Sequence, residues 1–253
     1  MRKVCFALLL IPFLINAQDD APTLVFQNVV LTPKVDKIAE FESALAAHNK
    51  RFHATDAHGC RVYNINSGPD IGKYIWTLGP TQWAALDSRP GEGAHDDDWA
   101  NVMKHCEPAA HGSYWSFDAS LSHFPADFNL SKLRVMYVDL KRNSGEEVAY
   151  LLGKIRATYA EHLTDEPYGI YWNQTSSTRE GRDMAVIWFF DKWAWMGEDS
   201  EFEKKFEMVH GEGSWDRWLD DWIDATEGTE LEFWVFRPDL SGLGGQVVAA
   251  ARQ

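Results

Sequence analysis

The sequence predicts an α+β fold made of two tandem βαββαβ units. The first observation behind this prediction is a recurrence of residues at constant spacing. Trp99, Trp115, Phe117, Leu121 and Ser122 return as Trp218, Trp234, Phe236, Leu240 and Ser241. The second is that both halves show the same order of expected strands and helices. The third is length, since 253 residues suffice for two cores. The repeat distance is far longer than the roughly 20–50 residues of solenoid repeats, which favours two small domains.

In the first half, residues 24–31 are apolar and β-branched, which predicts a strand. A helix follows Pro33, because apolar residues recur at steps of three and four. This stripe comprises Ile38, Phe41, Leu45, His48 and Phe52. Strands are expected at 60–65 and 73–78, joined by a turn rich in Gly, Pro, Asn and Asp. Helical stretches around 81–86 and 97–106 precede a last strand at 114–117.

The second half repeats this order. A strand at 133–140 is followed by a helix with the apolar stripe Val148, Leu151, Ile155, Tyr159 and His162. Strands at 170–173 and 184–190, helices at 198–209 and 214–225, and a strand at 231–236 complete it. The two units are therefore expected at 18–122 and 132–241, with a linker at 123–131 and a flexible tail at 242–253.

The N-terminus predicts a signal peptide at residues 1–17. Arg2 and Lys3 precede a short apolar run, and Ala17 offers a small residue for cleavage. The run is too short to span a membrane, so no membrane insertion is expected in the mature chain. We therefore expect an exported protein, periplasmic or secreted after cleavage near Ala17.

Charge and cysteine content narrow the expected partners. Removing residues 1–17 takes away two bases and no acid, which changes the formal net charge from −14 to −16. Such an acidic chain argues against nucleic acid as a partner, because phosphate backbones are repelled. After cleavage only Cys60 and Cys106 remain. Export permits one disulfide between them, and two buried free thiols fit the sequence equally well.

The βαββαβ order is the ferredoxin-like motif, an antiparallel sheet with helices on one face. The other face must be buried, and two units in one chain can bury these faces against each other. On this element order and the internal repeat, over residues 23–122 and 132–241, the chain resembles the dimeric α+β barrel superfamily. That superfamily includes antibiotic-biosynthesis-monooxygenase-like domains. The resemblance implies an intrachain α+β barrel with its ligand site between the two sheets.

Four residues are the candidate ligand-binding residues. Asn28 interrupts an apolar strand, and Tyr137 is its counterpart in the second half. A polar side chain on a buried strand face needs a partner, so both are expected to point into a shared pocket. The alternative is that this strand face is partly solvated. Trp76 and Trp188, on the third strand of each unit, are expected to line the same pocket; core filling by the rings is the alternative.

Haem-degrading members of the monooxygenase-like group carry an Asn on the first strand, a Trp on the third and a His on the second helix. Asn28 and Trp76 stand in comparable places here, with His95 or His105 as the third member. This resemblance implies haem chemistry as one alternative.

The remaining histidines are expected to have structural roles. Residues 95–98 (His-Asp-Asp-Asp) and His105 could hold a divalent ion, but acids favour a helix N-terminus, so a solvated helix start is the expectation. His53 and His162 are expected to stabilise helix C-termini, and His48 to be a core residue. The sequence therefore predicts no metal site and no cofactor, and it assigns no catalytic residue.

The sequence thus predicts an exported protein that binds a small apolar or aromatic ligand between its sheets. One alternative is a cofactor-independent monooxygenase or a haem-modifying enzyme. A second is a carbohydrate-binding protein, suggested by the 12 tryptophans. Because one chain supplies both halves of the barrel, a monomer is compatible with this fold.

Overall fold

A computed structural model describes residues 23–88, 90–91, 93–108 and 111–248. The predicted signal peptide, residues 1–17, lies outside these described residues. Within them, no helix combines the length and the apolar character that crossing a bilayer requires.

The first half consists of four strands and two helices. The strands are β1 (Val25–Leu31), β2 (Cys60–Ile65), β3 (Tyr74–Thr81) and β4 (His111–His123). The stripe of apolar residues after Pro33 forms α1 (Ile38–Phe52), and α2 (Gly93–Met103) precedes β4. The helix expected around 81–86 is a 3-10 helix, Trp83–Asp87. The expected strand at 114–117 is the central part of a much longer one.

The second half has the same order with one additional helix. Its strands are β6 (Lys132–Leu140), β7 (Tyr168–Asn173), β8 (Met184–Phe190) and β9 (Thr226–Phe236). Its helices are α3 (Gly145–His162), α4 (Phe202–His210) and α5 (Ser214–Ala225). Two short strands, β5 (Phe128–Asn129) and β10 (Gln246–Val247), pair with each other outside this order.

Eight strands close into one antiparallel barrel in the order β1-β3-β2-β9-β6-β8-β7-β4. Each half contributes four neighbouring strands, so the halves meet at two seams, β2–β9 and β7–β4. The fold is therefore α+β, with two ferredoxin-like units forming a barrel within one chain. The recurrence of individual residues between the halves stays a prediction.

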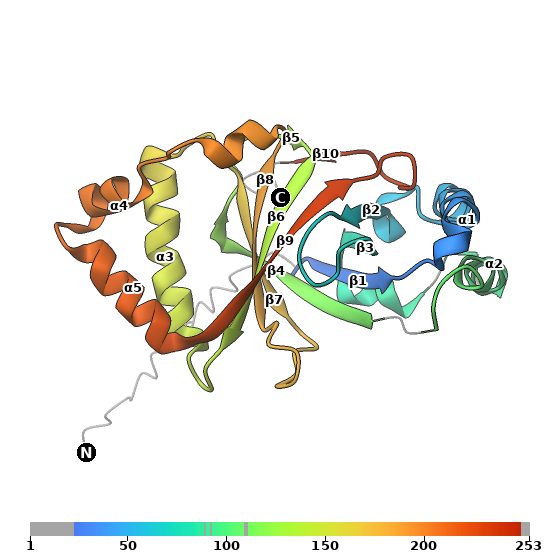
Figure 1. Cartoon of the computed structure of the whole chain (residues 1–253), viewed down its shortest axis with the longest axis horizontal. Helices are drawn as coiled ribbons and strands as arrows, with labels where there is room; N and C mark the ends of the chain where they lie inside the picture. Colours follow the sequence, from blue (N-terminus) through green and yellow to red (C-terminus); the bar gives the residue numbers. More distant parts are fainter. Residues whose placement is uncertain (1–22, 89, 92, 109–110, 249–253) are drawn as a thin grey trace, which may run out of the picture.

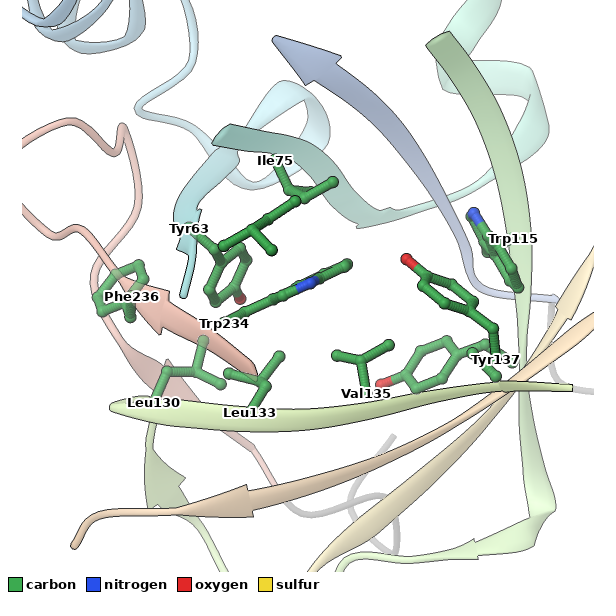
Figure 2. Packing of buried hydrophobic residues seen from close by; sticks show 12 residues of the cluster. Tyr63, Ile75, Trp115, Leu130, Leu133, Val135, Tyr137, Trp234 and Phe236 are labelled. Carbon is green, nitrogen blue, oxygen red and sulfur yellow. The ribbon is translucent and has the colours of Figure 1, made fainter. Parts of the chain in front are cut away.

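The helices lie outside the barrel in two groups. Figure 1 shows α1 and α2 beside the first half, and α3, α4 and α5 on the opposite side, with the barrel between them. Each barrel wall thus has two apolar faces. The outer faces pack against the helices in separate clusters, whereas the inner faces meet in one central cluster. Figure 2 shows this central cluster.

Of the predicted flexible tail, 242–253, the structure describes residues 242–248, and their flexibility stays a prediction. Residues 242–248 lie across one end of the barrel. The backbone N–H groups of Gly242 and Leu243 donate to the Cys60 carbonyl, and Arg61 donates to the carbonyls of Gly244 and Gln246. The segment has no helical or strand periodicity, and these hydrogen bonds attach it to the neighbouring strand β2.

Candidate functional site

The barrel encloses a cavity of about 360 Å³. Its walls are mostly apolar and aromatic, and they come from both halves of the chain. The lining includes Phe26, Asn28, Thr77, Trp115, Leu133, Val135, Tyr137, Tyr171, Ala185, Ile187 and Trp234. The volume falls within the roughly 300–1,000 Å³ typical of small-molecule sites. The cavity between the sheets is therefore the first candidate site.

Asn28 brings an unsatisfied acceptor into this cavity. It lies on β1 opposite Thr77 of β3, and both residues line the cavity. The Asn28 Oδ1 and Thr77 Oγ1 atoms are buried and have no hydrogen-bond partner among the described residues. Because buried polar groups are nearly always paired, these two atoms indicate a place where a bound molecule supplies the missing hydrogen bonds.

Tyr137 lies on β6 and also lines the cavity, as the sequence predicts. Its side chain is 4% exposed, and burial raises the pKa of its phenol well above the usual range. Burial likewise raises the pKa of Tyr63 to about 12. At neutral pH these phenols therefore keep their protons and act as hydrogen-bond donors.

A charged cluster closes the end of the barrel behind Tyr137. The Arg182 guanidinium lies 4.3 Å from the centre of the Tyr137 ring. It forms ion pairs with Glu230, with Asp70 at 3.2 Å and with Glu232 at 3.4 Å. Glu232 is fully buried, and this burial raises its pKa to about 7. The Trp234 indole N–H donates to Glu232 Oε2 at 2.7 Å, which links the cluster to the cavity wall.

The linker and the C-terminal segment also line the cavity. The linker between the halves contributes Phe124 and Leu130, and the C-terminal segment contributes Leu243 and Val247. The pairing of β5 with β10 joins these two segments. A molecule that enters the cavity at the end of the barrel where residues 242–248 lie therefore has to pass the linker and the C-terminal segment, which belong to neither group of helices.

Trp76 and Trp188 do not line the barrel cavity, which corrects the placement expected from the sequence. Both face outward toward helices. The Trp76 indole donates to Asn49 Oδ1 on α1 at 2.9 Å, and the Trp188 indole donates to the Tyr159 hydroxyl on α3 at 3.0 Å. Side chains alternate between the faces of a strand, and β3 and β8 present these two positions to the outer face.

The three residues of the haem-type set are likewise not brought together. Asn28 points into the barrel, whereas Trp76 and His95 line a second, lateral pocket of about 230 Å³ outside it. His105 lines neither pocket. The barrel wall thus separates the amide from the indole and the imidazole, and these residues do not form one haem site.

Sequence reasoning missed two groups of residues. Arg182 lies in the loop before β8 and Glu232 lies within β9, and their separation in sequence hides the ion pair. The lateral pocket holds the second group, in which His48 and His53 join His95 within a buried cluster. The spacing of His48 and His53 along one helix end was the available signal, but a position on an apolar stripe is typical of a core residue.

Comparison with known proteins identifies relatives by fold alone. No family model matches the chain, and no curated protein matches it. Among solved structures, a monooxygenase candidate from Fusobacterium nucleatum superposes with a TM-score of 0.56 at 10% identity, covering 85% of this chain and 93% of that one. A monooxygenase candidate from Lactobacillus acidophilus gives 0.55 at 12% identity, covering 89% and 99%.

An anthrone oxidase-like protein superposes with a TM-score of 0.51 at 10% identity, covering 86% of this chain and 92% of that one. Identities this low show a shared fold and leave the reaction open. The chain therefore has the ferredoxin-like α+β barrel fold of these proteins, over nearly the whole length of each.

Proposed function

We propose that this protein is a monooxygenase-like enzyme that binds a compact aromatic substrate in the barrel cavity. The observation that carries the proposal is the apolar cavity with the Asn28 Oδ1 atom in its wall, which has no partner among the described residues. Apolar walls with a few convergent polar groups are the usual form of a small-molecule site. The same cavity supports the simpler possibility of ligand binding without turnover, and the two are separated by experiment.

The polar groups indicate which substrate suits the cavity. Asn28 Oδ1 is an acceptor, so the substrate is expected to carry a hydroxyl or N–H donor. The protonated phenol of Tyr137 is a donor, which suits a carbonyl or a second hydroxyl oxygen. A hydroxylated aromatic molecule with few rings fits both requirements and the apolar walls.

The reaction class rests on the structural neighbours, which include monooxygenase candidates and an anthrone oxidase-like protein. If this chain catalyses a reaction of that class, O₂ would oxidise an activated methylene group of the substrate to a carbonyl. One oxygen atom enters the product and the other leaves as water with the two methylene hydrogens. The substrate supplies all the electrons for this step.

Binding is tested with naphthalene and 1-naphthol, which differ by one hydroxyl group. Both should quench the fluorescence of the cavity tryptophans Trp115 and Trp234 on titration into the full chain. Asn28→Ala should lower the affinity for 1-naphthol about tenfold, which corresponds to the loss of one hydrogen bond. The affinity for naphthalene should stay unchanged. Equal affinities for 1-naphthol in both proteins would contradict the role of Asn28.

A cavity-filling pair tests the location. Ala185 lines the cavity, whereas Ala160 is exposed on α3. Ala185→Phe should abolish binding of both probes, and Ala160→Phe should leave it intact, with thermal melts showing that both variants fold. Oxygen consumption with anthrone as the substrate then tests turnover. Binding without oxygen consumption would contradict the proposed enzymatic activity and would support a role in ligand binding alone.

Export belongs to the same proposal. The predicted cleavage near Ala17 places the mature protein outside the cytoplasm, and N-terminal sequencing of the secreted or periplasmic protein tests this. The carbohydrate alternative gains less support, because only Trp83 and Trp193 of the 12 tryptophans are exposed. Trp83 contacts Tyr114 and Trp193 contacts Phe190 and Phe233, so the two do not form one stacking surface.

A further inference from the structure

Three buried histidines meet outside the barrel, at the lateral pocket of the first half. His48 lies on α1, His53 directly follows that helix, and His95 lies on α2. They are 0%, 1% and 8% exposed. One ring nitrogen of each lies within 4.8 Å of those of the other two. Figure 1 shows how the two helices lie side by side against the sheet at this place.

Each ring holds its Nδ1 atom against an oxygen. Nδ1 of His48 lies 2.9 Å from Asp98 Oδ1, and Nδ1 of His95 lies 3.0 Å from Asp96 Oδ1. Nδ1 of His53 lies 2.7 Å from the backbone carbonyl of His58. A carboxylate or carbonyl oxygen only accepts hydrogen bonds, so each Nδ1 carries the proton. In a neutral imidazole the Nε2 atom then presents a lone pair.

These lone pairs have no proton to share. Nε2 of His53 faces Nε2 of His95 at 3.1 Å, and Nε2 of His48 is buried with no partner among the described residues. One additional proton between His53 and His95 would satisfy that pair but would leave His48 unsatisfied. A cation at the centre would satisfy all three nitrogens at once.

We propose that His48, His53 and His95 bind one divalent transition-metal ion of the zinc type through their Nε2 atoms. Three imidazoles are an established donor set for such ions, with bonds of about 2.0–2.1 Å. Two nitrogens bound to one tetrahedral ion at this length lie about 3.3 Å apart, close to the 3.1 Å between His53 and His95. Imidazole nitrogen suits Zn²⁺, Cu²⁺, Ni²⁺ and Co²⁺, whereas Mg²⁺ and Ca²⁺ require oxygen.

The groups that surround the three histidines also match those around known metal-bound histidines. Metal-bound histidines usually donate their other N–H to a carboxylate or a backbone carbonyl, which fixes the ring orientation. Asp98, Asp96 and the His58 carbonyl supply these acceptors, one for each ring. Asp98 therefore acts as a positioning residue for His48.

The fourth position of the ion faces the lateral pocket. His53 and His95 line this pocket together with Trp76, Trp99 and Met103. Three protein ligands and one open position are the arrangement of catalytic zinc sites, in which water or a small molecule completes the tetrahedron. The site thus accepts a small exogenous ligand against aromatic side chains, independently of any ligand in the barrel cavity.

The second half provides an internal control. His162 also ends the first helix of its half, but its side chain lies near Glu161 and belongs to no such group among the described residues. Among the described residues, the histidines at 48, 53 and 95 are the one group with converging metal-ligand atoms. The matched variant His162→Ala should therefore leave metal binding unchanged.

The test uses the full chain without a polyhistidine tag, stripped with a chelator and titrated with Co²⁺. Stoichiometric binding should give the intense visible bands of four-coordinate Co²⁺, and Zn²⁺ should displace it and raise Tm. His53→Ala and His95→Ala should lose the bands, whereas His162→Ala should keep them. Asp98→Asn should weaken binding about 10- to 100-fold, as expected for a group that orients a ligand.

A second measurement needs no variant. In the ¹⁵N-labelled wild-type chain, Zn²⁺ should shift the Nε2 resonances of exactly these three histidines, and Mg²⁺ should shift none. The proposal fails if Co²⁺ gives only the weak spectrum of the six-coordinate ion, or if Zn²⁺ leaves the three resonances in place. The metal-free spectrum could instead show a proton shared between His53 and His95 that Zn²⁺ does not affect. This result would mean that a shared proton, and not a metal ion, joins the two rings.

Discussion

At the residue scale, Glu232 combines full burial with an ion pair. Its carboxylate lies 3.4 Å from Arg182, yet burial outweighs this attraction and raises its pKa from 4.5 to about 7. The unfolded chain loses this proton near the usual value, whereas the folded chain keeps it until about pH 7. The folded state therefore binds more protons between these values, and stability falls as pH rises through this window.

Glu232→Gln should remove this pH dependence. The shift corresponds to about 3 kcal/mol, so wild type should lose about that free energy of unfolding between pH 4.5 and pH 8 relative to the variant. Urea denaturation at both pH values measures the difference. Glu212→Gln, at an exposed position, serves as the control and should follow wild type. A parallel profile for Glu232→Gln would contradict the raised pKa.

Cys60 and Cys106, the two cysteines among the described residues, are free and buried. Burial raises the pKa of Cys60 to about 12 and that of Cys106 to about 11. Because the thiolate is the reactive form, we expect both to react slowly with a disulfide reagent at pH 8 in the folded chain lacking residues 1–17. Both should react at once after denaturation without reductant. Absence of reactive thiols in the denatured chain would instead show a disulfide.

At the element scale, one buried amide of α1 contacts two other parts of the chain. Asn49 is fully buried; its Oδ1 accepts from the Trp76 indole on β3, and its Nδ2 donates to the Leu240 carbonyl at 2.7 Å. A single side chain thus connects a helix, a strand and the chain that leads to the C-terminal segment.

Asn49→Ala should destabilise the protein by about 2–4 kcal/mol, because it leaves a buried indole N–H and a buried carbonyl unsatisfied. Chemical denaturation measures this loss. Asn101→Ala, at an exposed position on α2, should change the free energy of unfolding by less than about 0.5 kcal/mol. Similar losses in both variants would show that the amide does not connect these elements.

The elements themselves were largely predictable from sequence periodicity. The stripe from Ile38 to Phe52 gave α1, and the apolar run at 184–190 is β8. Strand faces were harder to assign. Trp76 faces the helices and Asn28 faces the barrel, and alternation alone does not say which face is which when both faces are apolar.

The lateral histidine cluster could not be predicted for a related reason. His48 occupies a core position of α1, and only the packing of α2 brings His95 to it. Contacts between residues so far apart in sequence depend on the docking of whole elements. The apolar stripe correctly predicts that His48 is buried, but it does not predict which distant residues contact it.

At the scale of the whole molecule, the C-terminal segment completes the ligand cavity. Leu243 and Val247 line it, and Arg61 holds the backbone of the segment. A chain that ends at Ser241 should therefore bind naphthalene at least about tenfold more weakly, since burial of a single apolar side chain contributes about that much.

The matched control is a chain that ends at Val248, which retains all described residues and should bind like the full chain. Fluorescence titration compares the three proteins, and thermal melts report whether the shorter chain still folds. Unchanged affinity in the chain ending at Ser241 would mean that the segment does not cover the ligand.

The two seams of the barrel also determine when the protein can fold. One of them pairs β2, from the start of the chain, with β9, the last barrel strand. Until the ribosome has made β9, the first half has an unpaired strand edge and an uncovered apolar sheet face, both of which attract other chains. Folding is therefore an event of the finished polypeptide. In the exported protein that we propose, this delay would keep the chain unfolded until translocation is complete.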